Sequence, residues 1–303
     1  MSVKKRGIIA ASIAALAIAA TALTGCAQDS AAENGDSASS DPVRIGVVPG
    51  GQPYWDVFVD EAAKEGIEVE IVDFAEYPIP NPALTEGDLD LNQFQHIIYL
   101  ANYNVDADED LVALGSTVVY PMNVFSDKYD DIADSPEGGT VAIPNDESNR
   151  ARALLVLQKL GLIELEGGGS ATSSPDDIIA DKSRVSVTEV AADIIPATLP
   201  DVDAGVINND YVEPAGLDFA DSLGADSADD PAVAPYTNIF AARAEDADNE
   251  TYLKLVDIYQ NNEAVQAAVK DYVGDGAVLL KTPREELASI LKQAEDDYRA
   301  SQG

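Results

Sequence analysis

One apolar run near the start of the chain limits how much of the sequence can belong to a folded body. Three basic residues at positions 4–6 precede a stretch of Ala, Ile and Leu over residues 7–22. Small residues follow and lead to Cys26, the one cysteine of the sequence. A basic start, an apolar segment and a small-residue cleavage region form the pattern of an export signal. We therefore expect residues 1–25 to be a signal peptide that is removed from the mature protein.

The tetrapeptide LTGC that ends at Cys26 resembles a bacterial lipobox. This resemblance implies cleavage before Cys26, a diacylglycerol on its sulfur, and an anchor of fatty acyl chains such as palmitate. Two acyl chains hold a protein stably at a membrane. The alternatives are an ordinary secretory signal and a membrane-spanning helix, although the apolar run is near the lower length limit of a span. We expect a protein that is lipid-anchored at the cell membrane, on its extracytoplasmic face.

The segment after the cysteine contains no large apolar side chain over residues 27–42. We expect residues 26–42 to comprise the lipidated cysteine and a flexible tether, since such a segment cannot bury an apolar core. A flexible coil of this length has a root-mean-square reach of about 20–24 Å. The folded body then begins near Val43, and its roughly 260 residues are enough for two α/β lobes.

The composition excludes several classes of function. Without the three basic residues of the signal peptide, 15 Lys and Arg face 55 Asp and Glu, a formal charge of −40. Such a chain repels the phosphates of nucleic acids and anionic lipid surfaces. With Cys26 lipidated no thiol remains, and the single histidine, His96, excludes multi-histidine metal centres. We find no phosphate-binding loop and no Gly-x-Ser-x-Gly motif, and we expect neither an enzyme nor a bound cofactor or metal.

Strand-like and helix-like patterns alternate along the folded body. The predicted strands are 43–48, 67–72, 111–120, 140–143, 185–190, 204–207 and 238–242, and the predicted helices are 54–65, 148–160, 250–260, 263–273 and 283–299. Thr282 is the expected N-cap of the last helix, and residues 167–174 and 221–231 are expected to be loops. This alternation favours a mostly parallel α/β architecture. Ligands bind such sheets at the carboxyl ends of the strands.

Three segments carry candidate site residues. In the first, Phe94, His96 and Tyr99 are closely spaced, and if a helix begins there His96 and Tyr99 share a face. The alternative for a lone histidine near aromatic residues is a hydrogen-bonded core position. The third segment, residues 205–211, has Asn208 and Asn209 directly after a strand. This position suits a polar site, but the two asparagines are also an ordinary turn signal.

The second segment, residues 144–152, joins a strand to a strong helix. Free backbone N–H groups and the positive end of the helix dipole suit a carboxylate ligand at such a junction. Arginine is the residue that recognises carboxylates bidentately, and Arg150 and Arg152 both lie here. The alternative is that Asp146 only caps the helix and the arginines pair with surface acids.

Taken in order, the motifs of the chain resemble those of the NlpA-type lipoproteins over about residues 43–278. The motifs are Phe94-Gln95-His96, Tyr99-Leu100, Val119-Tyr120-Pro121, Val141 to Asp146, Asn149 with Arg152, Leu154 to Ile163, and Val206-Ile207-Asn208. NlpA-type proteins are the methionine-binding, substrate-binding components of ABC importers. The resemblance therefore implies a receptor that binds L- or D-methionine, delivers it to an ABC permease and ATPase, and acts as a monomer.

The resemblance also implies a fold and a set of binding residues. The fold is a two-lobed, type II-like periplasmic-binding-protein architecture with the ligand in the interlobe cleft. Lobe one would comprise 43–121 and 238–303, and lobe two 122–237. An arginine matching Arg152 binds the ligand carboxylate, and asparagines matching Asn149 and Asn208 bind its carboxylate and α-amino ends. Aromatic residues line the side-chain pocket, and their counterparts are Tyr77, Phe94, His96, Tyr99 and Tyr120.

The chain departs from the family pattern at several positions. Ile98 stands where the family commonly has proline, Asn209 and Asp210 replace small or hydroxyl residues, and residues 283–303 extend past the usual end. An unusual Tyr-Trp pair ending at Trp55 follows the first loop, and we expect it to touch one rim of the cleft. Another apolar amino acid, a methionine-containing dipeptide, or a non-transport interaction role therefore remain alternatives.

Overall fold

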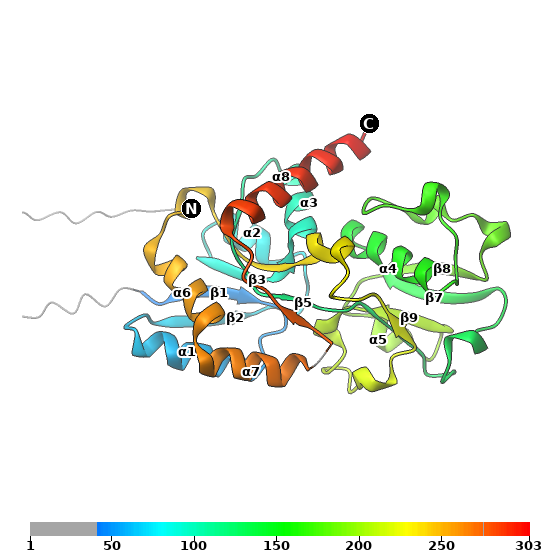
Figure 1. Ribbon diagram of the computed structural model, residues 1–303, viewed down its shortest axis with the longest axis horizontal. Coiled ribbons are helices and arrows are strands. Elements are labelled where there is room, and N and C mark those ends of the chain that lie inside the picture. The colour runs from blue at the N-terminus through cyan, green and yellow to red at the C-terminus, as the bar shows by residue number, and fades with distance from the viewer. Residues whose placement is uncertain (1–40, 275) are drawn as a thin grey trace, which may run out of the picture. The chain divides into compact units, whose positions relative to one another are not determined.

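The computed structural model describes residues 41–274 and 276–303 (Figure 1). The predicted signal peptide, Cys26 and the tether up to residue 40 lie outside the described residues. Within the described part of the chain, no helix is both long and apolar enough to cross a membrane.

The first sheet has five strands in the order β2-β1-β3-β11-β4. These are β1 (Val43–Val47), β2 (Val69–Asp73), β3 (Leu91–His96), β4 (Val112–Ser116) and β11 (Asn238–Ala242). Strand β1 is parallel to β2 and β3, whereas β11 is antiparallel to β3 and β4. The sheet is therefore mixed.

Helices cover both faces of this sheet, because alternate residues of a strand point to opposite faces. Phe240 and Ala242 of β11 pack with α1 (Tyr54–Lys64), α6 (Glu250–Asn261) and α7 (Glu263–Val273). Ile239 and Ala241 pack with α2 (Pro80–Thr85), α3 (Ile97–Ala107) and α8 (Arg284–Ser301). Figure 1 shows these two groups on opposite sides of the strands.

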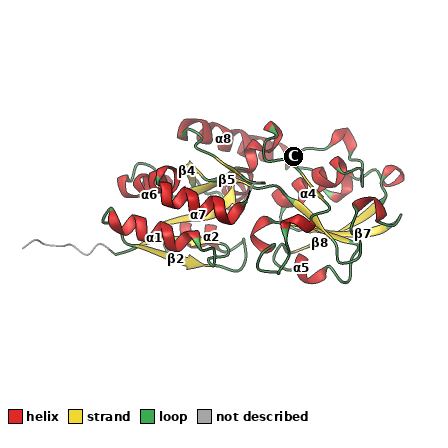
Figure 2. Cartoon of the chain, turned by 60° about the horizontal axis from the view of Figure 1, so that its bottom comes forward, coloured by secondary structure: helices red, strands yellow, loops and turns green. Residues whose placement is uncertain are grey.

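The second sheet also has five strands, in the order β10-β6-β9-β7-β8. They are β6 (Asn123–Phe125), β7 (Gly139–Pro144), β8 (Val185–Val190), β9 (Ala204–Ile207) and β10 (Gly224–Ala225). Strand β7 is parallel to β8 and β9, and β6 is antiparallel to β9 and β10. Helices α4 (Glu147–Lys159) and α5 (Ile195–Thr198) pack on opposite faces of this sheet (Figure 2).

Short elements complete the chain. Strands β5 (Val118–Val119) and β12 (Val278–Leu279) form an antiparallel pair. Short 3₁₀ helices lie at Ile132–Asp134, Glu166–Gly168, Pro175–Asp177, Ala180–Lys182, Asn209–Tyr211, Phe219–Asp221, Pro231–Tyr236 and Ala244–Asp246.

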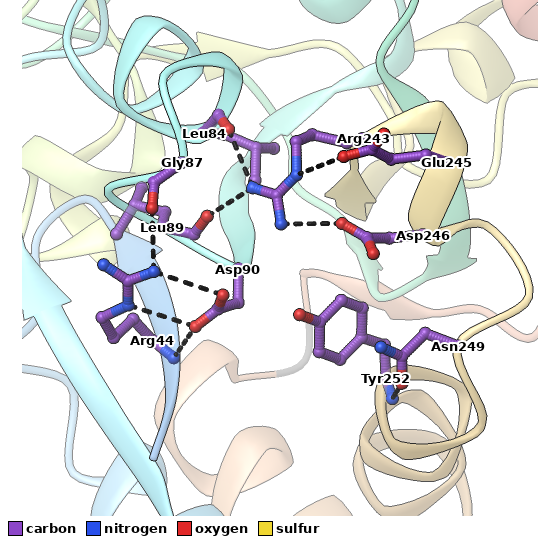
Figure 3. A network of polar contacts seen from close by, with 10 residues as sticks. All are labelled: Arg44, Leu84, Gly87, Leu89, Asp90, Arg243, Glu245, Asp246, Asn249 and Tyr252. Atoms are coloured by element: carbon purple, nitrogen blue, oxygen red, sulfur yellow. Dashed lines mark hydrogen bonds and ion pairs between the residues drawn. The ribbon is translucent and has the colours of Figure 1, made fainter. Parts of the chain in front are cut away.

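A polar network fixes the loop that leads into β3 (Figure 3). Arg44 of β1 donates from Nε to Asp90 Oδ2 at 3.2 Å and from Nη2 to the Gly87 carbonyl at 2.8 Å. Arg243, which follows β11, donates to the carbonyl oxygens of Leu84 and Leu89 at 3.0 and 2.7 Å. The loop is thus attached to strands on both sides of β3, which positions the far end of β3, where the candidate site begins.

The predicted α/β fold class is confirmed, and the strands at 185–190, 204–207 and 238–242 have the predicted bounds. The expectation of a mostly parallel architecture is also confirmed, because only β11 in the first sheet and β6 in the second run against the other four strands of their sheet. The strands fall on the expected sides of residues 121 and 237, and the division into lobes at those positions stays a prediction.

Three local expectations were wrong. The predicted strand 111–120 divides into β4 and β5, because the chain leaves the first sheet after Ser116 and pairs with β12. Pro283, and not Thr282, occupies the N-cap position of α8; the Thr282 N–H instead donates to Ser116 Oγ at 2.8 Å. The predicted loop 221–231 contains strand β10.

Candidate functional site

The candidate site is a cavity at the carboxyl ends of strands from both sheets. All eight residues predicted to bind a ligand line it: Tyr77, Phe94, His96, Tyr99, Tyr120, Asn149, Arg152 and Asn208. Strand β3 and the start of α3 supply three of them, the first two turns of α4 supply two, and the position after β9 supplies Asn208. The structure therefore brings the eight together, and their roles in binding stay predictions.

The N-terminus of α4 sets the orientation of one amide. Asp146 is the N-cap, and its Oδ1 accepts hydrogen bonds from the Asn149 backbone N–H at 3.0 Å and from Asn149 Nδ2 at 2.9 Å. Burial raises the pKa of Asp146. Because a carboxylate accepts and the Asn149 Nδ2 group donates, Asn149 Oδ1 is left on the side of His96 and Asn208.

His96 is held in one neutral form. It ends β3 and caps α3, with its Nδ1 accepting from the Tyr99 N–H at 3.2 Å. The proton is then on Nε2, which donates to Asn149 Oδ1 at 3.3 Å. Burial, with a smaller contribution from Arg152, lowers the pKa of His96 to about 3. If a helix began in this segment, His96 and Tyr99 were expected to share one of its faces. Helix α3 begins only after His96, so this expectation was wrong.

Asn208 continues this hydrogen-bond chain. Its Nδ2 donates to Asn149 Oδ1 at 2.8 Å. Its own Oδ1 is buried and has no hydrogen-bond partner in the part of the chain that the structure describes. Asn208, which lines the cavity, thus carries one acceptor without a donor.

Arg152 supplies the positive charge of the cavity, and Arg150 does not. Arg152 Nε donates to Asp226 Oδ2 at 2.7 Å, and Nη2 donates to the Tyr120 carbonyl oxygen at 2.7 Å. Its Cζ lies 4.6 Å from the centroid of the Tyr236 ring, a cation–π distance. Arg150 instead forms an exposed ion pair with Glu189, as the alternative for this segment predicted.

Aromatic rings form the apolar wall. The ring centroids of Tyr77, Phe94 and Tyr99 lie 5.7–6.1 Å from one another. Burial raises the pKa of Tyr77 and Tyr99, so both phenols are neutral at physiological pH. The wall can receive an apolar or thioether side chain.

Three residues of the site escaped the sequence prediction. Asp226 lies in a segment predicted as loop, and Tyr236 lies beside the predicted lobe boundary at residue 237. Asp210 had been noticed only as a departure from the family pattern. It lines the cavity, and its Oδ2 accepts from the Tyr77 hydroxyl at 2.6 Å.

Trp55 does not lie at the rim of the cleft, which corrects the expectation for that residue. It is 2% exposed and packs edge-to-face against Phe58, with ring centroids 5.6 Å apart. Its Nε1 donates to Gln52 Oε1 at 3.1 Å. The large indole ring belongs to the core beside β11, where its burial contributes more than a rim contact would.

No group of three or more His, Cys, Asp or Glu side chains among residues 41–274 and 276–303 is arranged to hold a metal ion. The family described as NlpA lipoprotein matches residues 43–280. The chain belongs to the NlpA lipoprotein family. The family resemblance predicted from the sequence is therefore confirmed. Helix α8 lies beyond the matched residues.

Relatives and solved structures cover most of the chain. The D-methionine-binding lipoprotein MetQ of Salmonella typhi is 36% identical over 248 residues, which are 80% of this chain and 90% of the relative. The structure of protein PG110 from Staphylococcus aureus is 37% identical with a TM-score of 0.80, covering 83% of this chain and 99% of that one. A nutrient-binding protein from Burkholderia cenocepacia, solved bound to methionine, is 35% identical with a TM-score of 0.72, covering 78% and 99%.

Proposed function

We propose that this protein is the lipid-anchored, extracytoplasmic solute-binding component of an ABC importer, and that it binds methionine. The observation that carries the proposal is the combination, in one cavity, of a buried guanidinium with a wall of aromatic rings. Relatives that are named as methionine-binding proteins and match most of the chain support it.

The cavity matches the two ends of an apolar amino acid. Two nitrogens of Arg152 donate to protein oxygens, whereas Nη1 donates to none within the described residues. That nitrogen is available to a ligand carboxylate, with which it would form a charge-assisted hydrogen bond. The rings of Tyr77, Phe94 and Tyr99 then receive the side chain, where a thioether sulfur makes favourable aromatic contacts.

Binding would draw the two halves of the protein together. Phe94 and His96 come from an element of the first sheet, and Arg152 and Asn208 from elements of the second. A ligand that contacts both favours the closed arrangement over an open one. We propose that the closed form delivers methionine to a permease driven by an ATPase, and that Cys26 keeps the receptor beside that permease.

Calorimetric titration of the detergent-solubilised mature protein with L- and D-methionine tests the ligand. Arg152→Ala is expected to weaken binding by about 2–5 kcal/mol, because it leaves the ligand carboxylate without its cation. Arg150→Ala is the matched control, since Arg150 lies two residues away and pairs with Glu189 outside the cavity. Circular dichroism shows whether each variant is folded.

The outcomes separate the alternatives. Binding of methionine by the wild type and by Arg150→Ala, with loss in a folded Arg152→Ala protein, is the expected result. Preference for leucine or for glycyl-methionine would reassign the ligand within the same fold. Absence of binding to every amino acid and dipeptide would contradict the transport role.

The anchor has a separate test. Cys26→Ser is expected to move the protein from the membrane fraction to the soluble fraction, because the lipid anchor is expected to be attached through the Cys26 sulfur. A Cys26→Ser protein that stays in the membrane fraction would contradict the lipid anchor.

A further inference from the structure

Asp210 is an acidic group of the cavity that the predicted site did not include. It lies in the 3₁₀ helix after β9 and lines both the cavity and a small adjoining void that shares Phe94, Tyr120 and Asn238. Its Oδ2 accepts from the Tyr77 hydroxyl at 2.6 Å. Its Oδ1 accepts no hydrogen bond within the residues described. One carboxylate oxygen is therefore free to receive a donor from a ligand.

The neighbouring amide presents a second acceptor, and the reason lies in the hydrogen-bond chain. Asp146 fixes Asn149 so that its Oδ1 accepts from both His96 and Asn208. Asn208 must then use its Nδ2 as the donor, so its Oδ1 points away from Asn149. This Oδ1 is a buried acceptor without a partner among the described residues. A buried acceptor left unpaired costs free energy, so that this atom also needs a donor.

The charges of the cavity are otherwise balanced. Arg152 is paired with Asp226 at 2.7 Å, and buried His96 is neutral. No Lys or Arg of the described residues pairs with Asp210. Burial raises the pKa of Asp210 from 3.8 to about 7, with only the Tyr77 hydrogen bond lowering it. The carboxylate therefore lacks a positive partner in the part of the protein that the structure describes.

We propose that Asp210, together with Asn208 Oδ1, receives a primary ammonium group of the ligand, and that the site thereby selects ligands carrying both a free ammonium and a free carboxylate. An ammonium has three N–H donors and no acceptor. Asp210 and Asn208 are two residues apart in the chain, both line the cavity, and each offers an oxygen that has no donor among the described residues. Arg152, which lines the same cavity, takes the carboxylate. This inference rests on the proposed function of the same cavity, and it adds Asp210, an acidic residue outside the family pattern, to the recognition of the amine.

A pH dependence follows from this pairing. An ammonium partner favours the ionised carboxylate, so that ligand binding lowers the pKa of Asp210. Below a pH of about 7 the free protein must first lose a proton, and affinity falls by up to about tenfold per pH unit. Above a pH of about 7 the affinity reaches a plateau.

Other groups face Asp210 and must be considered. The phenols that face it have pKa values raised by burial, so none of them ionises between pH 5 and 8; they are Tyr54, Tyr77, Tyr120, Tyr211 and Tyr272. Arg152 lines the same cavity, and the other charged groups that act on these phenols are Asp146, Asp193 and Glu213. Because these are the same in the wild type and in an Asp210 variant, the difference between the two proteins isolates Asp210.

The test compares wild type, Asp210→Asn and Asp176→Asn by calorimetry with methionine from pH 5 to 8. The amide introduced by Asp210→Asn would still accept from Tyr77 through its oxygen, whereas Asp176 is an exposed residue outside the cavity whose substitution removes the same charge. At pH 8 the Kd of Asp210→Asn is expected to rise by at least about 30-fold. Its Kd should be flat between pH 5 and 7, while wild type and Asp176→Asn weaken as the pH falls.

N-acetyl-methionine provides a second readout, because it keeps the carboxylate and thioether and lacks the ammonium. Wild type is expected to reject it, and Asp210→Asn to discriminate far less between it and methionine. Equal binding of methionine by Asp210→Asn and wild type, with the same pH profile, would overturn this inference while leaving the proposed function intact. Failure of the wild type to bind any amino acid or methionyl dipeptide would overturn the proposed function itself.

Discussion

Removing a single hydroxyl from helix α8 should weaken ligand binding without touching the cavity. Tyr298 is 4% exposed, and its hydroxyl hydrogen-bonds Glu147 in the first turn of α4. The same hydroxyl lies 3.2 Å from Asp106 Oδ2 on α3. Helix α3 packs on the first sheet and α4 on the second. The Tyr298 hydroxyl therefore connects the two halves, and it does so from a helix outside the family-matched residues.

The size of the effect follows from these contacts. A hydrogen bond to a charged acceptor contributes about 1.5–3 kcal/mol, and partial solvent access at Glu147 reduces this to about 1–2 kcal/mol. If the contact with α4 is made only in the closed arrangement, Tyr298→Phe raises the ligand Kd by about 5- to 30-fold. Burial and the two carboxylates raise the pKa of Tyr298, so the hydroxyl keeps its proton across physiological pH.

Tyr103→Phe is the matched control. Tyr103 also lies on α3, but its hydroxyl bonds Thr85 Oγ1 at 2.9 Å, which joins α3 to α2 within one half. Calorimetry with methionine and small-angle X-ray scattering with and without ligand measure affinity and closure. We expect weaker binding and a more open ligand-free ensemble for Tyr298→Phe alone. Unchanged affinity in Tyr298→Phe, or an equal loss in Tyr103→Phe, would refute the reasoning.

Further predictions concern stability, measured by urea or thermal unfolding. Leu287→Ala on α8, where Leu287 is fully buried, should cost about 2–5 kcal/mol, and a change below about 1 kcal/mol would mean that α8 is not docked. Gly115→Ala should destabilise by about 1–3 kcal/mol, because its Cβ would overlap Val256 Cγ1. Val256→Ala should partly rescue it, and no rescue would contradict the clash. The pKa of Asp210 in the folded protein is raised to about 7, so the ligand-free protein should lose stability as the pH rises from about 4 to 7. Asp210→Asn should flatten this dependence of the unfolding free energy on pH. Equal pH dependences in the two proteins would count against the buried carboxylate.

Regular apolar patterns were the part of the fold that the sequence predicted well. Strands such as β8 and β9 are rich in valine or isoleucine between turn residues, and α7 begins after Asn262, whose Oδ1 accepts from the first-turn N–H groups. These signals lie within each element and its flanking residues, and they were enough to predict whether the segment is a strand or a helix.

Strand β3 was missed for a physical reason. Four of the six residues in its sequence LNQFQH are polar, yet every residue is buried. The amides of Asn92 and Gln95 bond to each other and to Asn81, with distances of 2.6–2.9 Å. Burial of these amides is tolerated because they satisfy one another, and only the tertiary structure shows such a network.

Some residues of the candidate site could likewise be predicted from the sequence, and others could not. Seven of the eight predicted residues lie in motifs that the family shares, and Tyr77 was predicted as the counterpart of an aromatic residue of the family. Asp210 and Asp226 could not be found, because the chain has 55 Asp and Glu and an isolated acid carries little signal. Tyr298 lay in an extension without a motif, and its contact with Glu147 depends on how α8 packs.

Native mass spectrometry of the purified mature protein with methionine tests the central claim most directly. The account predicts one methionine per protein chain in the wild type and in Arg150→Ala, and none in a folded Arg152→Ala protein. Retention of methionine by Arg152→Ala as by the wild type, or the absence of any bound amino acid in the wild type, would contradict it.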